Sequence, residues 1–189
     1  MKLSALPTAL AMTLACLTFP TAANATIETP EAKLAAAEAA HSALEKLPDH
    51  FDDAKLKPGE FRWKDDRERV TKVVVSLTDQ MLYAYDGDEL IAVSTISSGK
   101  ESHPTPTGIF PIMQKARFHR SNQYNDAPMP YMQRLDNYGI ALHAGDLPGY
   151  PASHGCIRLP KKFAAKLFAA TEIGTEVMVG RYEVVTTDA

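Results

Sequence analysis

The chain has 189 residues, of which 45% are hydrophobic and 23% are charged, with 10 Gly, 13 Pro and 2 Cys. This ordinary globular composition excludes a disordered tail, a collagen-like fibre and a disulfide-dense mini-protein. The formal net charge is −3, so the basic excess typical of proteins that bind nucleic acid or an anionic membrane is missing. We therefore expect no nucleic-acid partner.

The first 25 residues show the three-part pattern of a secretory signal peptide. Lys2 gives a positive start, an apolar run follows over residues 3–19, and the small residues Ala23-Asn24-Ala25 close the segment. We expect cleavage after Ala25 and export, to the periplasm. A membrane anchor and a lipoprotein site at Cys16 are the alternatives, but the apolar run is short for a bilayer span, and no later stretch is long enough for one.

Residues 26–67 are expected to form an alanine-rich helix and a charged linker. Thr29-Pro30-Glu31 is a helix start, with a hydroxyl at the N-cap, a proline at the first position and an acid at the positive end. The helix is predicted to run to about Leu47, where Pro48-Asp49 ends it. One stripe at helical spacing, with a histidine at its flank rather than as a ligand, contains Leu34, Ala37, His41 and Leu44.

The segment 49–69 carries dense mixed charge around Phe61 and Trp63. We interpret it as a linker that lies across the main domain with Trp63 as its anchor, and we expect the charged side chains to be solvated.

From Val70 onward the sequence predicts short strands and turns. The expected strands are 71–77, 80–85, 89–96, 109–113, 138–143 and 176–179, and a helix is expected over 160–170. Residues 114–137 form an irregular, polar and aromatic insertion, and such a long loop in a compact domain is more often functional than idle. We expect it to be a lid or wall over the cysteine discussed next, lined by Tyr124, Met129 and Tyr131.

Cys156 is the one cysteine left once a signal peptide is removed. A lone thiol is a liability in an oxidising compartment, so its presence indicates a reactive thiol or an intermolecular link. The alternative is a buried, inert cysteine that acts as a small apolar residue. The neighbouring residues favour the reactive thiol.

The segment 141–159 supplies the groups that a cysteine nucleophile needs, which are a base for the thiol proton and donors for an oxyanion. His143 ends an expected strand, and His154 lies two residues before Cys156. Gly155 allows a substrate to approach the backbone closely, and the amides of Gly155 and Cys156 are the candidate oxyanion-hole donors.

Arg158 and Ser153 each have a functional and a structural interpretation. Arg158 is suited to raise the thiolate fraction or to hold a substrate carboxylate, and equally to form a structural ion pair. Ser153 is as well suited to a turn as to catalysis.

Zinc is the rival interpretation of His103, His143, His154 and Cys156, because these are zinc-ligand types. However, His154 and Cys156 are separated by one residue, and no Cys-x-x-Cys pair accompanies them. This spacing disfavours a metal site, and we expect none.

The run Ser153-His154-Gly155-Cys156-Ile157-Arg158 resembles the signature of the L,D-transpeptidase catalytic domain, the YkuD family, which remodels bacterial peptidoglycan. His143 stands where the family has its upstream histidine. Residues 74–77 with 80–85 resemble the family's opening hairpin, and Ser98-Gly99 followed by 105–110 resembles its Gly then Thr-Pro-x-Gly-x-Phe passage.

The likeness covers residues 68–182 in consistent order. Two departures concern substrate preference more than reaction type: His143-Ala144-Gly145 stands where the family often has His-Gly, and the loop from His143 to Ser153 is short.

The resemblance implies a mainly β fold, a YkuD-like mixed β-sandwich with one or two short helices, preceded by the N-terminal helix. The expected organisation is a signal peptide over 1–25, the helix and linker over 26–67, the catalytic domain over 68–182 and a tail over 183–189.

The resemblance also implies roles for the residues of the motif. Cys156 would be the acylated nucleophile and His143 the general base, while Ser153 and His154 would orient the loop and hydrogen-bond the site. The residues expected to bind substrate are Arg158, Tyr131 and Gly145.

The implied reaction is an acyl transfer on peptidoglycan stem peptides that needs no cofactor. Cys156 would attack the bond between the diamino acid and D-alanine of a tetrapeptide stem, and an amine would resolve the thioester to give a 3→3 cross-link. The alternatives are an L,D-carboxypeptidase, an enzyme that attaches a lipoprotein to the wall, and a non-catalytic wall-binding or zinc-holding protein. The oligomeric state stays open.

Overall fold

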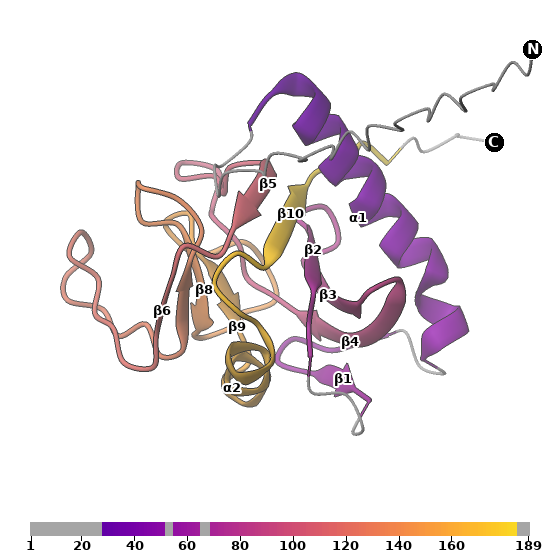
Figure 1. Cartoon of the computed structure of the whole chain (residues 1–189). Coiled ribbons are helices and arrows are strands. Elements are labelled where there is room, and N and C mark those ends of the chain that lie inside the picture. The colour runs from indigo at the N-terminus through magenta and orange to yellow at the C-terminus, as the bar shows by residue number, and fades with distance from the viewer. Residues whose placement is uncertain (1–27, 52–54, 65–68, 185–189) are drawn as a thin grey trace, which may run out of the picture.

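Figure 1 shows the computed structural model of the chain, which describes residues 28–51, 55–64 and 69–184. The expected signal peptide and the last residues of the expected tail lie outside the described residues. In chain order the elements are α1 (Pro30–His50), β1 (Phe61–Trp63), β2 (Lys72–Ser76), β3 (Met81–Asp86), β4 (Glu89–Thr95), β5 (Gly108–Pro111), β6 (Gln114–Ala116), β7 (Met132–Arg134), β8 (Ala141–Ala144), β9 (Ile157–Leu159), α2 (Lys161–Ala170) and β10 (Glu176–Gly180).

The strands form two mixed sheets. One has the order β1-β4-β3-β2-β10-β5 and the other the order β6-β7-β8-β9. The pairs β2–β10 and β8–β9 are parallel. The main core lies between the two sheets and α2, with buried side chains from all three. The expected fold class, mainly β with mixed sheets and an N-terminal helix, is confirmed.

The larger sheet is buried on both faces. Val73 and Val75 of β2 belong to the core shared with α2, whereas Val74 belongs to a second cluster that contains Ala40 and Leu47 of α1. Figure 1 shows α1 lying across this outer face. A strand covered on both sides reads as a continuous apolar run rather than an alternating one, which explains the valines of β2.

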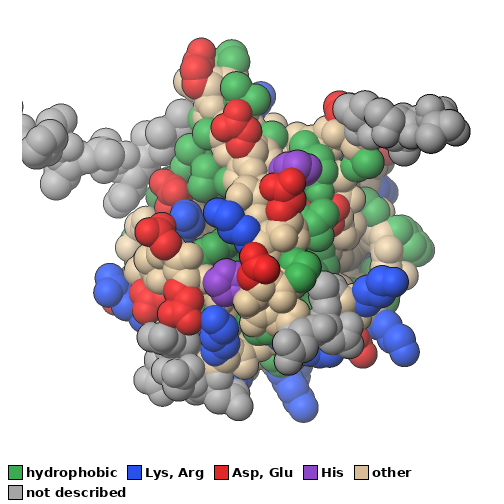
Figure 2. Space-filling model, turned by 90° about the vertical axis from the view of Figure 1, so that its right-hand side faces the viewer, with side chains coloured by type: hydrophobic (Ala, Val, Ile, Leu, Met, Phe, Trp, Pro, Cys, Tyr) green, Lys and Arg blue, Asp and Glu red, His purple; other side chains and the backbone are tan. Residues whose placement is uncertain are grey.

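The face of α1 that packs on the sheet is the alanine face, so the stripe of Leu34 and Leu44 expected from the sequence is wrong. Leu34 is 61% exposed and Leu44 38%, and Figure 2, which views this side, shows hydrophobic side chains scattered among charged ones. The helix approaches the sheet so closely that a Cβ atom on Gly180 would lie 2.1 Å from the Ala36 carbonyl oxygen. The buried residues of α1 are Ala32, Ala36, Ala40, Ala43 and Leu47.

The expected end of this helix is also wrong by one turn. Helix α1 continues through Pro48 to His50, and the Phe51 amide closes the last turn on the Leu47 carbonyl at 3.1 Å. Pro48 has no backbone N–H to donate, but the helix still ends on a hydrogen bond, which the Phe51 amide donates.

The charged linker contains a strand that the sequence pattern did not predict, because three residues are too few to show a period. Strand β1 pairs antiparallel with β4. The rings of Phe61 and Trp63 both lie 5.5 Å from the ring of Phe163 in α2. Trp63 and Phe61 therefore attach this segment to the main core.

Two expectations for the second sheet need correction. The insertion 114–137 is a hairpin rather than an irregular loop, because β6 pairs with β7 and the Met129 and Tyr131 amides continue the pairing at 2.9 Å beyond it. The strand expected over 138–143 begins only at Ala141, because Asp136 Oδ1 accepts the Tyr138 and Ile140 amides, both at 2.9 Å, and holds a turn there.

The close contact of α1 predicts an overpacking effect. Ala40→Leu should lower the free energy of unfolding by about 1–3 kcal/mol, because the larger side chain would overpack the buried contact between α1 and the sheet. The control Leu34→Ala should change it by less than about 0.5 kcal/mol, since this leucine faces solvent. Urea unfolding of the three proteins measures both, and equal effects would contradict the assignment of the alanine face.

Candidate active site

The alternation of side chains in the smaller sheet places the candidate residues on one face. Arg134 pairs with Ala141, and His143 pairs with Arg158, so all four side chains share the face opposite the core. This face forms the floor of a cavity of about 1000 Å³, whose lining includes Cys156, His154 and Ser153.

The tip of the β6–β7 hairpin forms a wall of the cavity. Tyr124 and Met129 both line it, as expected. The Tyr124 ring stacks on the His154 ring at a centroid distance of 4.5 Å, and the His103 ring meets His154 edge-on at 4.9 Å. The hairpin tip therefore touches the motif loop through aromatic contacts.

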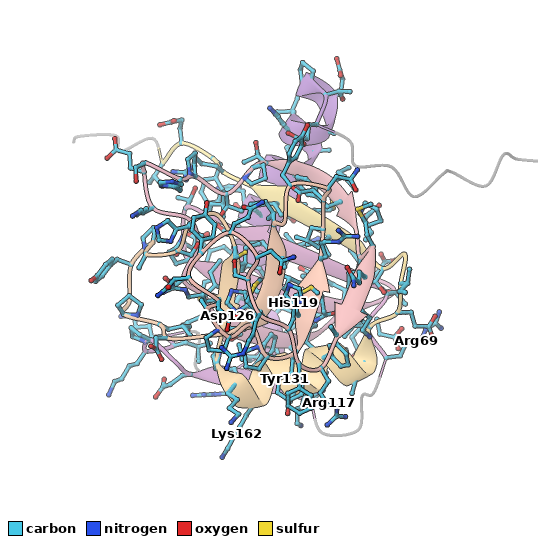
Figure 3. All side chains as sticks on the ribbon, turned by 90° about the vertical axis from the view of Figure 1, so that its left-hand side faces the viewer. Arg69, Arg117, His119, Asp126, Tyr131 and Lys162 are labelled. Atoms are coloured by element: carbon cyan, nitrogen blue, oxygen red, sulfur yellow. The ribbon has the colours of Figure 1, made fainter. Side chains whose placement is uncertain are left out.

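Tyr131 does not line the cavity, which corrects its expected role in binding substrate. Its ring packs 5.9 Å from the Phe168 ring of α2, with the Arg117 guanidinium over it, and Figure 3 shows Tyr131 and Arg117 beside that helix. The cause is the alternation of side chains along the strand. Met132 and Arg134 lie on the cavity side, and Tyr131, which precedes Met132, lies on the opposite side.

Cys156 is half-buried and lies immediately before β9. Its side chain packs against Met129, Met132 and Ala141, and its Sγ atom donates to the Gly139 carbonyl at 3.5 Å. Burial raises the pKa of the Cys156 thiol; the Ala141 backbone opposes this rise, Asp136 adds to it, and Arg158 opposes it. The neutral thiol is therefore favoured at neutral pH, and ionisation needs a base.

His143 is buried and neutral. Its Nδ1 atom lies 2.8 Å from the Ala144 carbonyl, which can only accept, so Nδ1 carries the proton and Nε2 has a free lone pair. Burial lowers the pKa of His143, the Ala144 carbonyl opposes this, and the charges of Arg158 and His119 lower it further. The imidazole is therefore able to accept a proton at neutral pH.

The pairing of β8 with β9 puts this base beside the thiol. Leu142 is opposite Ile157, so the preceding residues, Ala141 and Cys156, are also neighbours. His143 then lies one diagonal step from Cys156 on the same face, a spacing that long or aromatic side chains bridge.

Ser153 organises the motif loop. Its hydroxyl donates to the Cys156 carbonyl and accepts the Gly155 amide at 3.1 Å. The Gly155 amide was expected to bind an oxyanion, but it is engaged within the loop here. Gly155 itself is required by its φ of +112°, and a Cβ atom there would lie 2.7 Å from Ile140 Cδ1.

His154 is exposed, and its pKa is lowered first by desolvation and then by the charges of Lys100, His103 and Arg158. Its ring contacts are with Tyr124 of the hairpin tip and with His103. Gly145 and Arg158 both line the cavity, and they pack together, because a Cβ atom on Gly145 would lie 3.0 Å from Arg158 Cγ and Cδ.

Two supporting residues were missed in the sequence. Thr105 Oγ1 donates to the Gly155 carbonyl and accepts the Gly99 amide, both at 2.8 Å, so it ties three loops together. Asp136 is buried and fixes the turn that presents the Gly139 carbonyl to the sulfur. The only signal for Thr105 was the Thr-Pro-x-Gly passage, and Asp136 had none.

In the described part of the chain no group of three or more His, Cys, Asp or Glu side chains is arranged to hold a metal ion. No helix in the same residues is long and apolar enough to cross a bilayer.

A half-buried thiol with a neutral imidazole on the neighbouring strand defines a candidate cysteine acyl-transfer centre on a mixed β fold. The model of the L,D-transpeptidase catalytic domain, YkuD, matches residues 71–179. The chain belongs to this family.

Solved L,D-transpeptidases share the fold. The L,D-transpeptidase (Yku) from Stackebrandtia nassauensis has a TM-score of 0.55 and 26% identity, over 67% of this chain and 61% of that one. An Enterococcus faecium L,D-transpeptidase has a TM-score of 0.52 and 28% identity, over 59% of this chain and 50% of that one. The Ldtfm–avibactam carbamoyl enzyme has a TM-score of 0.53 and 28% identity, over 61% of this chain and 50% of that one. This chain thus covers only about half to three-fifths of those proteins. No curated protein matches it.

The charge of Asp136 gives a test of the thiol environment. Asp136→Asn keeps an oxygen for the Tyr138 and Ile140 amides but removes the charge that helps to raise the pKa of Cys156. The pH midpoint of Cys156 alkylation by iodoacetamide should lie above the ordinary thiol value of 9.0 in the unaltered protein and move to lower pH in the variant. Asp146→Asn, which removes the carboxylate of the cavity lining, is the matched control and should leave the midpoint in place. A midpoint that stays put in Asp136→Asn would contradict the electrostatic assignment.

Proposed function

We propose that this protein is an exported peptidoglycan L,D-transpeptidase that uses Cys156 as its nucleophile and His143 as its general base. The observation that carries the proposal is the placement of both side chains on one face of the β8–β9 pair, in one cavity, within a domain of the L,D-transpeptidase family. Export rests on the signal-peptide pattern of the first 25 residues.

The chemistry follows from the protonation states of the two groups. His143 Nε2 removes the thiol proton as Sγ attacks the carbonyl carbon between the diamino acid and D-alanine of a tetrapeptide stem. The carbonyl π electrons move to the oxygen, and the Cys156 amide stabilises the resulting negative charge. The Gly155 amide does not take this role, because it donates to the Ser153 hydroxyl.

Collapse of this intermediate breaks the C–N bond. D-alanine leaves with the proton from His143, and a thioester remains on Cys156. An amine from a neighbouring stem then attacks the thioester, His143 takes the proton of that amine, and it returns the proton to the departing sulfur. No cofactor enters either step.

The other residues have supporting roles in this proposal. Ser153 and Thr105 hold the loop that carries the nucleophile, and His154 supports the wall formed by the hairpin tip. Arg158 acts on the charges of the catalytic pair and takes part in substrate binding, and Gly145 makes room for its side chain.

Product masses from purified protein and tetrapeptide muropeptides test the proposed reaction. We expect cross-linked dimers with one D-alanine lost per bond, and no product from Cys156→Ser. Trimmed monomers alone would show that water resolves the thioester and that the protein is an L,D-carboxypeptidase. Absence of both products, with no mass adduct at Cys156 after incubation with avibactam, the compound bound in the Ldtfm carbamoyl enzyme, would contradict an acyl-transfer function.

The pH profile tests His143. Burial puts its pKa below the ordinary value of 6.5, so the base is neutral above pH 6.5, and acylation is lost only as the pH falls through the lowered pKa. The rate of acylation by a tetrapeptide stem should therefore show an acid limb with a midpoint below 6.5. His143→Gln should lower the rate by about 10²–10⁴-fold and remove this limb, with the thermal melting of the variant as the folding control. A midpoint above 6.5, or an unchanged rate in His143→Gln, would exclude this assignment.

A further inference from the structure

Arg134 is a cation on the cavity floor with an unsatisfied donor. It lies at the end of β7 and lines the cavity, and its Nε atom is buried without a hydrogen-bond partner among the described residues. A buried donor without a partner destabilises a protein. Such an atom in a binding cavity indicates a partner that arrives with the ligand.

Other cations of the same hairpin have partners, which makes Arg134 different. Lys115 donates to the Phe168 and Thr171 carbonyls at the end of α2. Arg120 pairs with Asp126 at 2.9 Å, and the Arg117 guanidinium lies over the Tyr131 ring at 5.9 Å. Each of these three faces away from the cavity or lies at the exposed tip.

The register of the sheet gives the position of Arg134 relative to the nucleophile. Arg134 is paired with Ala141, and Ala141 packs against Cys156, so the three residues form one row across the sheet. Two interstrand spacings separate the ends of this row, which is about 10 Å between backbones. A guanidinium at that distance reaches the neighbourhood of a peptide bond held at the sulfur.

The charge of the cavity favours an anionic ligand. Its lining contains three fixed cations, Arg134, Arg158 and Lys161, against one carboxylate, Asp146. Arg158 is committed in part, because its stem packs beside Gly145 and its charge acts on both Cys156 and His143. Of the two arginines, Arg134 is thus better placed to meet substrate, since Arg158 acts on the proposed catalytic pair.

We propose that Arg134 binds a carboxylate of the donor stem peptide and selects stems that carry it, an inference that rests on the proposed function. A guanidinium forms two parallel hydrogen bonds with a carboxylate, which would satisfy the buried Nε atom. Two carboxylates flank the attacked bond, one on the leaving D-alanine and one on the side chain of a diamino acid such as diaminopimelate.

The test measures kcat/KM for three synthetic tetrapeptide stems. The first carries diaminopimelate and a free C-terminus, the second has the C-terminal carboxylate replaced by an amide, and the third has lysine in place of diaminopimelate. Arg134→Gln should lower kcat/KM for the first stem by about 10–100-fold. The loss should disappear for the stem that lacks the paired carboxylate, because a variant cannot lose a bond that the substrate no longer offers.

The controls separate recognition from folding and from charge. Arg117→Gln removes the same charge outside the cavity lining and should leave kcat/KM within about twofold. Arg134→Lys should recover part of the loss, because it keeps the charge but cannot form two parallel hydrogen bonds with a carboxylate. Alkylation of Cys156 by iodoacetamide should be unchanged in Arg134→Gln. An equal loss on all three stems, or no loss on the first, would overturn the assignment.

Binding measurements keep this inference distinct from the proposed reaction. Calorimetric titration of the first stem into Cys156→Ser, with and without Arg134→Gln, needs no turnover. A stem that binds in an Arg134-dependent way but yields no product from the unaltered protein would sink the transferase proposal and support carboxylate recognition. A stem that is converted to product but binds equally well with and without Arg134→Gln would support the transferase proposal and contradict carboxylate recognition by Arg134.

Discussion

The parallel pairing of β8 with β9 is the constraint on which the site depends. It sets His143 opposite Arg158 and Ala141 beside Cys156, so the proposed base, the proposed nucleophile and a cation share one face. Side chains alternate along a strand, so a slip of one residue would turn the imidazole into the core. The loop before β9 is fixed by Ser153 and Thr105, which bond to backbone groups on either side of the nucleophile. The geometry of the candidate site is therefore a consequence of backbone pairing.

Burial acts in opposite directions on the two central groups and gives both the same state. It raises the pKa of the Cys156 thiol and lowers the pKa of His143, because each charged form is disfavoured away from water. Both groups are therefore neutral at neutral pH, and in the proposed mechanism the proton moves from the thiol to the imidazole as a substrate arrives. A neutral thiol is also the less oxidisable form, which matters for Cys156 because it has no disulfide partner among the described residues.

The sequence was sufficient where a pattern is local. The valine-rich strands, the helix after Leu159 and the cysteine motif all follow from spacing within a few residues. It was insufficient where the burial or orientation of a side chain depends on residues far away in the chain. The buried face of α1 was misjudged because apolar size favoured the leucines, whereas the approach of Ala36 to Gly180 admits only small side chains. The roles of Asp136 and Arg134 could not be predicted from the sequence. The sequence of a three-residue strand beside a polar turn does not indicate which side chains face a cavity.

The β6–β7 hairpin connects recognition to the rigid core. On one side of its base, Lys115 and Tyr131 contact α2, and on the other side Arg134 and Met132 face the cavity. The tip is held differently, by stacking of Tyr124 on the exposed ring of His154. Stacked rings slide at lower cost than buried hydrogen bonds break. If the proposed carboxylate recognition by Arg134 holds, the base of the hairpin would provide the fixed contact and the tip would adjust to the rest of the peptide. Substrate selection and access would then depend on separate parts of one element.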